Sequence, residues 1–456
     1  AHKVRSPQDQ SLDAQALGFS NLKPYPGDET ENLVSVLEPG QQDFNFSEFT
    51  PPEHSELVVY ELLLRDFLET NSYAALTDTL DYLDRLGVNA IELMPVSNFG
   101  GNESWGYNPN FHLALDKAYG PPEDLKQFVE AAHQRGMAVL LDVVYNHATN
   151  QSPLVQMYGT SDNPWLNVPA SSPFSVFNQL NHGNAFVKEY IDRANAYWLE
   201  EFNVDGFRFD LSKGFISGQP SDPNGYQPQR IDNLQRIADH VWSVDPEAHV
   251  ILEHFGVPQE EQELSAYRAD ETGGMMLWNN LNEPYNQVSM GFEEGSDISG
   301  TYYENRGLDN PNYMTYMESH DEQWLMRRNK LFGNSSGDYS VQDLPTALNR
   351  QKLVGAFFFP VPGPRMMWQF GELGYGWGPE ECLKPGGGGN GDCAAGDPGR
   401  TAPKPIRWEY RDPEQNPARV RLYETWSALI DLRNSHDVFT SPSTSVTITP
   451  AGGEGT

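Results

Sequence analysis

Residues 137–147 read MAVLLDVVYNH, an apolar run that ends in a polar cluster. The segment before it begins near Glu123, has helical spacing and closes at Gly136, as helices that end on a glycine do. The apolar run from Met137 to Val144 does not alternate with polar residues, which indicates a strand buried on both faces. This stretch predicts one helix-and-strand unit of an α/β fold with a parallel sheet.

The same alternation of apolar runs and helical segments recurs along the chain. The predicted strands are Leu57–Leu64, Ala90–Met94, Met137–Val144, Asp205–Phe209, His249–Leu252, Met275–Trp278, Tyr313–Met317 and Met366–Phe370. Eight strands alternating with helices over roughly 380 residues predict a (β/α)8 TIM barrel with insertions. A doubly wound open sheet is the alternative, but it usually has fewer strands and a phosphate-binding glycine loop after the first, which this sequence lacks.

Segments outside the predicted strands suggest how the chain is divided. Residues 1–55 are polar with several prolines, and we expect a lead-in wrapped on the barrel or the remnant of a preceding module. The barrel is expected over 56–440, with a small insertion after the third strand at 148–182, rich in Asn, Ser and Pro. Residues 441–456 begin to alternate like a strand, which predicts the start of a truncated C-terminal β region.

Composition excludes two classes of partner. The 456 residues contain 64 Asp and Glu against 30 Lys and Arg, a net charge of -34 that repels the phosphates of nucleic acids. No apolar stretch reaches the roughly 18 residues that a membrane-spanning helix needs. The surplus carboxylates either hydrate a halophilic protein in concentrated salt or form an ordinary solvated surface, and the sequence leaves both open. We expect a monomer.

Two cysteines, Cys382 and Cys393, flank a glycine-rich segment. A disulfide that closes this loop is predicted, with free thiols as the alternative, and it fits an oxidising compartment. A metal site has less support because no histidine or further cysteine lies nearby. The chain begins AHKVRSPQDQ without an apolar signal segment, so we expect an extracellular or periplasmic protein whose signal was removed, with the cytosol as the alternative.

Polar residues follow four of the predicted strands, where a barrel of this type builds its active site. These strand ends carry Asp142 and His147, Arg208 and Asp210, Glu253 and His254, and Glu318 to Asp321. Taken singly, each has a structural explanation as a helix cap, an ion pair or a packed histidine. Together on one rim, so many charged groups would repel and desolvate one another, which favours a functional site.

Chemistry assigns roles to three carboxylates. Arg208 and Asp210 lie on the same side of one strand, and the guanidinium favours an ionised Asp210, as a nucleophile requires. Glu253 follows an apolar strand, and partial desolvation raises the pKa of a carboxyl, as a proton donor requires. Carboxyls on adjacent strands are expected about 5 to 5.5 Å apart, the spacing of retaining glycosidases. Asp321 adds a carboxylate that can hold sugar hydroxyls and stabilise oxocarbenium charge.

The motifs DVVYNH, GFRFD, the strand-five glutamate and SHD resemble, in this order, the four signature regions of the α-amylase family of retaining glycoside hydrolases. The resemblance covers about residues 55–440. It implies that Asp210 is the nucleophile, Glu253 the general acid/base and Asp321 the transition-state stabiliser. By the same resemblance, the residues that position the sugar are Asp142, His147, Arg208 and His320, with Tyr107 of the segment SWGYNP stacked beneath it. Leu180-Asn181-His182 resembles the short fifth region.

The resemblance also has departures that affect specificity and metal binding. Many members carry Lys-His where this chain has Lys213-Gly214, and Lys213 is expected to contact a glucose on the leaving-group side. Asn146 matches a position that often binds a structural calcium ion, an oxygen-seeking hard cation. However, Asp162 is the only acidic residue of the insertion. Calcium is therefore a possible structural ion, and no cofactor is expected for catalysis.

Within the family, the lead-in and barrel resemble secreted bacterial α-amylases that carry a β-sandwich module ahead of the barrel. The resemblance implies an endo-acting hydrolase of α-1,4-glucosidic bonds in starch, glycogen or maltooligosaccharides, working through a covalent glycosyl-aspartate. A glucanotransferase or glycogen branching enzyme shares the same signature and stays open as an alternative. A glucan-binding protein on an inactive scaffold is the third hypothesis, and the three carboxylates argue against it.

Overall fold

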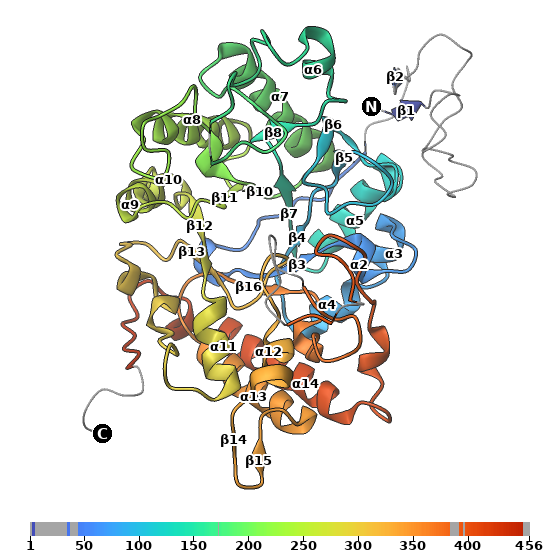
Figure 1. Ribbon diagram of the computed structural model, residues 1–456, viewed down its shortest axis with the longest axis vertical. Helices are drawn as coiled ribbons and strands as arrows, with labels where there is room; N and C mark the ends of the chain where they lie inside the picture. Colours follow the sequence, from blue (N-terminus) through green and yellow to red (C-terminus); the bar gives the residue numbers. More distant parts are fainter. Residues whose placement is uncertain are drawn as a thin grey trace. The chain divides into compact units, whose positions relative to one another are not determined.

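A computed structural model describes residues 2–4, 34–36, 44–171, 173–383, 392–394 and 397–449. Its central strands close into a barrel in the order β10-β11-β12-β13-β16-β3-β4-β7, which confirms the predicted fold (Figure 1). Their bounds are β3 Val58–Leu62, β4 Ala90–Leu93, β7 Ala138–Val143, β10 Gly206–Phe209, β11 His249–Leu252, β12 Met276–Asn280, β13 Tyr313–Tyr316 and β16 Arg365–Trp368. Each predicted strand overlaps one of these.

Helices alternate with the barrel strands along the chain. They are α2 Leu64–Phe67, α3 Tyr73–Thr77, α4 Leu80–Leu86, α5 Pro122–His133, α6 Pro153–Tyr158, α7 Ala185–Phe202, α8 Pro228–Val244, α9 Pro258–Ala266, α10 Ala269–Thr272, α11 Asn282–Met290, α12 Leu325–Phe332, α13 Leu344–Phe358 and α14 Pro417–Asn434. Helices α5, α8, α9 and α14 begin at a proline, whose missing N–H costs nothing at the first helical position.

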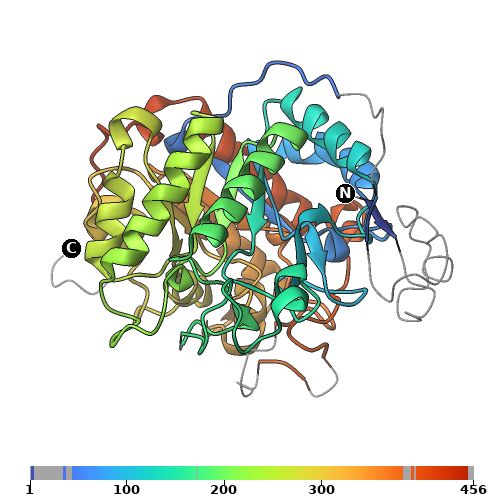
Figure 2. The ribbon, with the colours of Figure 1, turned by 90° about the horizontal axis from the view of Figure 1, so that it is seen from above.

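The chain divides into two compact units. The first unit comprises Ala1–Pro51, Thr70–Leu80 and Glu92–Met275, and the second comprises Pro52–Glu69, Asp81–Ile91 and Met276–Thr456. Helices α7 and α8 of the first unit lie side by side (Figure 2), joined by an ion pair of 2.7 Å between Arg236 Nη1 and Asp192 Oδ1. No helix among the described residues is long and apolar enough to cross a membrane.

Strand β10 is the centre of the first unit. It pairs in parallel with β7 on one side and with β11 on the other, and the register places Arg208 opposite Asp142. Gly206 lets β10 and β11 approach, because a Cβ at this position would lie 2.2 Å from His249 O. All residues of the three strands are buried, as their apolar sequences predict.

The segment between β7 and α7 holds α6 and a two-stranded antiparallel sheet of β8 (His147–Ala148) and β9 (Asn178–Gln179). Side-chain amides connect this segment to the chain that follows β10. Gln179 Nε2 donates to Gly214 O at 3.0 Å, and Asn167 Nδ2 donates to Ile216 O at 3.0 Å. Buried amides that satisfy backbone carbonyls in this way fix the position of an irregular segment.

The second unit contains β12, β13, β16 and β3, which pair in parallel. Helix α14 packs there through Trp426, which is buried and donates from Nε1 to Gln351 O at 3.0 Å.

Only part of the two predicted terminal regions lies within the described residues. In the N-terminal part, β1 (His2–Val4) pairs antiparallel with β2 (Val34–Val36), and most of the predicted lead-in lies outside the described residues. Residues 441–449 form no strand, and 450–456 lie outside the described residues, so the C-terminal β region stays a prediction.

A buried carboxyl in the second unit makes stability depend on pH. Glu372 Oε1 accepts hydrogen bonds from Tyr60 at 3.0 Å and Tyr82 at 2.5 Å, and burial raises the pKa of Glu372 from 4.5 to about 7. The folded protein therefore binds this proton more tightly than the unfolded chain. The resulting stability is complete below the unfolded pKa and is lost as the pH rises through about 7.

We expect Glu372→Gln to flatten the fall in stability between about pH 5 and pH 8, because the amide accepts the same hydrogen bonds without ionising. The measurement is the midpoint of urea unfolding as a function of pH. Glu414→Gln, at an exposed position, is the matched control and should leave the wild-type profile unchanged. An unaltered pH dependence in Glu372→Gln would contradict the assignment.

Candidate active site

A single buried guanidinium organises the site in the first unit. Arg208 Nη1 donates to both oxygens of Asp142 at 2.9 Å and to Asp210 Oδ1 at 3.1 Å, while Nη2 lies 3.1 Å from Glu253 Oε2. Burial opposes the charge, but the carboxylates of Asp142 and Glu253 hold the pKa of Arg208 well above its ordinary value. Three predicted carboxylates thus share one permanent cation, as the register of β7, β10 and β11 requires.

The backbone after β10 also contacts the predicted proton donor. Leu211 adopts a left-handed conformation with φ of 46°, and its N–H donates to Glu253 Oε2 at 2.7 Å. Ser212 N–H donates to Glu253 O at 3.0 Å. A left-handed leucine is strained, and such strain is typical of functional sites. Both Asp210 and Glu253 keep some exposure, 13% and 14% of the side chain, whereas Asp142 and Arg208 have none.

Tyr107 is brought to the same group of residues. Its hydroxyl donates to Asp142 Oδ2 at 2.6 Å, and its ring centroid lies 5.8 Å from the guanidinium carbon of Arg208. The preceding Gly106 has φ of 101°, and a Cβ there would lie 2.6 Å from Pro95. Glycine is therefore required to present the tyrosine, whose face is suited to the C–H surface of a sugar.

His147 lies beside Tyr107, and the protein occupies both of its ring nitrogens. Nε2 lies 2.8 Å from Tyr107 O, and Nδ1 lies 3.2 Å from Asn146 Nδ2. Burial lowers the pKa of His147 to about 4, so the ring is neutral at pH 7. The partners assign the proton to Nε2, because Nδ1 must accept from the amide. The predicted contact of His147 with sugar stays a prediction.

Asn146, the predicted calcium ligand, is buried after β7. Its Oδ1 is buried without a hydrogen-bond partner, which suits a ligand atom, and its Nδ2 donates to Phe174 O at 3.1 Å. However, no group of three carboxylate, imidazole or thiolate side chains surrounds it in the described part of the chain. Ca²⁺ takes six to eight oxygens, which carboxylates, side-chain amides, backbone carbonyls and water can all supply, so calcium at Asn146 stays a prediction.

The same asparagine explains the missing histidine after Lys213. A Cβ on Gly214 would lie 1.9 Å from Asn146 Oδ1, so a larger side chain there would require Asn146 to shift. Lys213 itself donates from Nζ to Phe255 O at 3.2 Å and is half-buried, and burial lowers its pKa. It therefore lies close to the chain that follows Glu253, and its contact with a glucose stays a prediction.

A buried network below Glu253 was not predicted. Ser212 Oγ lies 2.9 Å from His254 Nδ1, and His254 Nε2 lies 3.0 Å from Glu260 Oε2. Arg230 Nη2 donates to both oxygens of Glu260 at 2.6 and 2.7 Å. Since burial lowers the pKa of His254, the ring is neutral, and Nε2–H donates to the carboxylate. Ser212 is fully buried, so this network braces the site and has no exposed nucleophile.

The second unit places His320 and Asp321 together. His320 Nδ1 lies 2.6 Å from Glu61 Oε1, and its Nε2 lies 3.5 Å from Asp321 Oδ1. Asp321 also forms an ion pair with Arg400. The ring of His320 lies between Trp278 and Trp368, with centroid distances of 6.0 and 6.4 Å. The predicted meeting of Asp321 with Asp210 and Glu253 at one rim stays a prediction.

Sequence reasoning missed Glu61 and Arg400. Glu61 had a signal, because it is the one charged residue in the apolar strand LVVYELLL, where it is fully buried. Arg400 had none, because it lies 79 residues from Asp321 in a segment without predicted structure.

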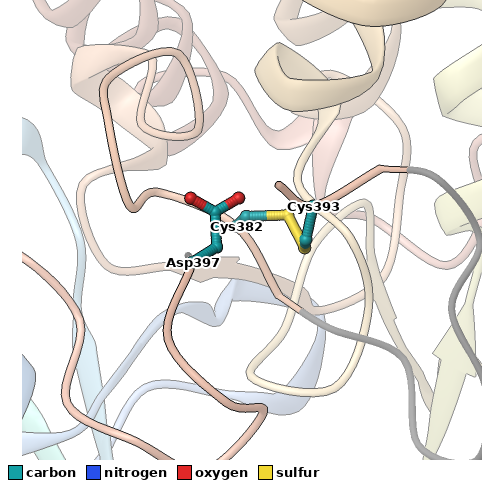
Figure 3. A group of neighbouring side chains, drawn as sticks. All are labelled: Cys382, Cys393 and Asp397. Atoms are coloured by element: carbon teal, nitrogen blue, oxygen red, sulfur yellow. A yellow bond between two sulfur atoms is a disulfide. The ribbon is translucent and has the colours of Figure 1, made fainter. Parts of the chain in front are cut away.

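The predicted disulfide between Cys382 and Cys393 is confirmed (Figure 3). Asp397 lies beside it, and this trio has the spacing of a metal site. The two sulfurs are bonded to each other, however, so neither is a thiolate that can bind a metal.

Comparisons with known proteins relate parts of the chain to known families. Residues 70–167 match the family model described as the catalytic domain of alpha amylase. Malto-oligosyltrehalose trehalohydrolase from Saccharolobus solfataricus is 35% identical over 169 residues, which cover 37% of this chain and 29% of that protein. The 1,4-alpha-glucan-branching enzyme of Emericella nidulans is 32% identical over 179 residues, which cover 38% of this chain and 26% of that protein. Each match thus spans less than a third of the relative.

The fold recurs in a solved structure. Pullulanase type I from Bacillus subtilis, complexed with maltose, superposes with a TM-score of 0.67 and 21% identity over 90% of this chain and 60% of that chain. At this identity the likeness concerns the fold alone, and it supports the closed barrel.

Proposed function

We propose that this chain, whose residues 70–167 match the family model of the alpha amylase catalytic domain, cleaves α-1,4-glucosidic bonds within α-glucans and retains the configuration of the anomeric carbon. The observation that carries the proposal is the shared contact of Arg208 with Asp142, Asp210 and Glu253. One permanent cation among three carboxylates keeps an ionised nucleophile beside a second carboxyl, as retaining glycoside hydrolysis needs.

The proposed reaction uses two steps. Asp210 attacks the anomeric carbon while Glu253 gives a proton to the leaving glycosidic oxygen, which forms a glycosyl-aspartate. Glu253, now ionised, takes a proton from water, which attacks the anomeric carbon from the vacated side and releases Asp210. Asp142 is fully buried and holds Arg208 and Tyr107, so we assign it to positioning.

We further propose that Asp321 is the transition-state stabiliser of this reaction. Parallel strands of a closed barrel end on one rim, and β10, β11 and β13 precede Asp210, Glu253 and Asp321. There Asp321 would accept hydrogen bonds from sugar hydroxyls and stabilise oxocarbenium charge. The confirmed disulfide supports an oxidising compartment, hence an extracellular or periplasmic location.

The proposal predicts products of retained configuration. Freshly cleaved maltooligosaccharides, followed by proton NMR before mutarotation, should show new α-anomers first, and soluble starch should yield intermediate chain lengths early. Immediate β-anomers would contradict a retaining mechanism. Release of one product size from the chain end would contradict internal cleavage.

A glucanotransferase is the second candidate, favoured by the match to a branching enzyme. Transfer to a glucan hydroxyl uses the same glycosyl-aspartate with a sugar in place of water. Incubation with amylose separates the two activities, because branching lowers the iodine colour without a matching gain in reducing ends. Hydrolysis lowers the colour and raises reducing ends together.

A further inference from the structure

Asp321 is contacted by Arg400, a residue of the second unit that lies 79 positions later in the chain. Arg400 donates from Nη1 to Asp321 O at 3.2 Å and from Nη2 to Asp321 Oδ1. The same Oδ1 lies 3.5 Å from His320 Nε2. Arg400 therefore donates to both the backbone carbonyl and one carboxylate oxygen of Asp321. These two hydrogen bonds limit the rotation of the Asp321 side chain.

The start of the loop is fixed by the disulfide and by helix α12. Figure 3 shows Cys382 bonded to Cys393 beside Asp397. Arg327 of α12 donates from Nε to Asp392 O at 2.7 Å and from Nη2 to Asp397 Oδ2 at 3.2 Å. Since α12 begins four residues after Asp321, the helix that follows Asp321 also holds the loop that carries Arg400.

The chain around Arg400 is organised by two further cations. Lys404 is buried, and its Nζ donates to three backbone carbonyls, those of Gly399, Arg400 and Ala402, at 2.7 to 3.0 Å. Arg65 Nη1 donates to Thr401 O at 2.9 Å. Burying the charged Lys404 costs free energy, which its hydrogen bonds to the three carbonyls offset. These hydrogen bonds fix the backbone around Arg400, whose side chain stays partly exposed.

We infer that Arg400 is a positioning residue for Asp321 in the proposed reaction, and that the Cys382–Cys393 disulfide, which precedes Arg400 in the chain, helps to set its place. The inference rests on the proposed function, which makes Asp321 the transition-state stabiliser. Arg400 keeps the carboxylate oriented beside His320, so its loss would act on the chemical step more than on sugar binding.

The ion pair by itself contributes little to folding. Its two side chains are 31% and 33% exposed, and ion pairs this exposed to solvent add little to the free energy of unfolding. A role in stability alone would therefore leave turnover unchanged when Arg400 is replaced. Turnover of Arg400 variants therefore distinguishes a role in stability from a role in positioning Asp321.

The first test compares Arg400→Ala and Arg400→Lys with Arg421→Ala, a control at an exposed position of α14. We expect Arg400→Ala to lower kcat on maltooligosaccharides by about 10- to 100-fold with KM within about twofold, and Arg400→Lys to recover part of kcat. The control should match the wild type. Unchanged or raised kcat in Arg400→Ala would overturn the inference.

The second test opens the loop with dithiothreitol and, separately, with the double variant Cys382→Ser/Cys393→Ser. Reduction should lower kcat of the wild type towards that of Arg400→Ala and leave Arg400→Ala unaffected, because both changes remove the same restraint. Equal losses in the two proteins would overturn the role of the loop. Thermal unfolding of each sample checks that the fold persists.

Failure of the proposed function gives a different result. If the wild type releases no reducing ends from any α-glucan in this assay, the proposed function is wrong, and the inference is wrong with it. If the wild type turns over and Arg400→Ala equals it, only the inference is wrong.

Discussion

Asp210→Asn should lower kcat on soluble starch by at least about 10⁴-fold, because the neutral amide cannot form the glycosyl ester on which both steps depend. Release of reducing ends measures the loss. Asp210 accepts a hydrogen bond from Arg208, and asparagine keeps an oxygen for it, so the circular dichroism spectrum should not change. Asp270→Asn, at an exposed position of α10, is the matched control and should retain activity. Activity retained in Asp210→Asn would contradict the assignment.

Azide can tell the nucleophile from the proton donor. Asp210→Ala leaves room for azide to attack the anomeric carbon directly, so an aryl α-maltooside with a good leaving group should yield the inverted β-glycosyl azide. Glu253→Ala still forms the glycosyl-aspartate, and azide then attacks its opposite face to give the α-glycosyl azide. Exchange of these two products between the variants would mean that the roles of Asp210 and Glu253 are reversed.

Arg208→Met should strongly destabilise the first unit. It leaves Asp142 buried beside Asp210 and Glu253 without the cation, and breaking a buried pair costs about 3–5 kcal/mol. We expect a drop of this size in the free energy of unfolding by urea, together with at least about a 100-fold loss of kcat.

The double variant Arg208→Met/Asp142→Asn tests the electrostatic cause. Removing the uncompensated carboxylate should restore part of the lost stability while activity stays low. Arg236→Met removes an ion pair with Asp192 whose side chains are 29% and 22% exposed, so it should cost no more than about 1 kcal/mol. No recovery in the double variant would mean that lost packing, and not charge, destabilises Arg208→Met.

The barrel strands could be predicted because each one is marked by its own run of residues and does not depend on contacts with distant segments. A run such as His249–Leu252 is buried on both faces, and its apolar sequence alone marks its bounds. Boundaries were less certain where apolar residues continue past a strand. The run that starts at Leu57 was predicted to stay extended to Leu64, but β3 ends at Leu62 and Leu64 begins α2, because leucine is equally suited to a buried helix.

The site was predictable in the first unit for a related reason. Arg208 and Asp210 lie two positions apart at the end of β10 and therefore point to the same side. Parallel pairing with β7 then brings Asp142 beside Arg208. Contacts between distant segments carry no such pattern. His320 and Glu61 lie 259 residues apart, and no spacing rule connects them. His254 and Glu260 lie closer together in the sequence, and they hydrogen-bond to each other. Their support of the site also depends on Arg230 of α8, which donates to Glu260.

Two backbone amides bind Glu253 to the turn that directly follows Asp210: Leu211 N–H holds its carboxylate and Ser212 N–H its carbonyl oxygen. The two reacting groups are therefore parts of one rigid body, and thermal motion shifts them jointly. In the described part of the segment at 148–182, hydrogen bonds to the chain after β10 are made further along, at Gly214, Ile216, Gly218 and Gln219. Evolution could accordingly lengthen, shorten or exchange that segment to accommodate a different glucan without disturbing the alignment on which bond breaking depends.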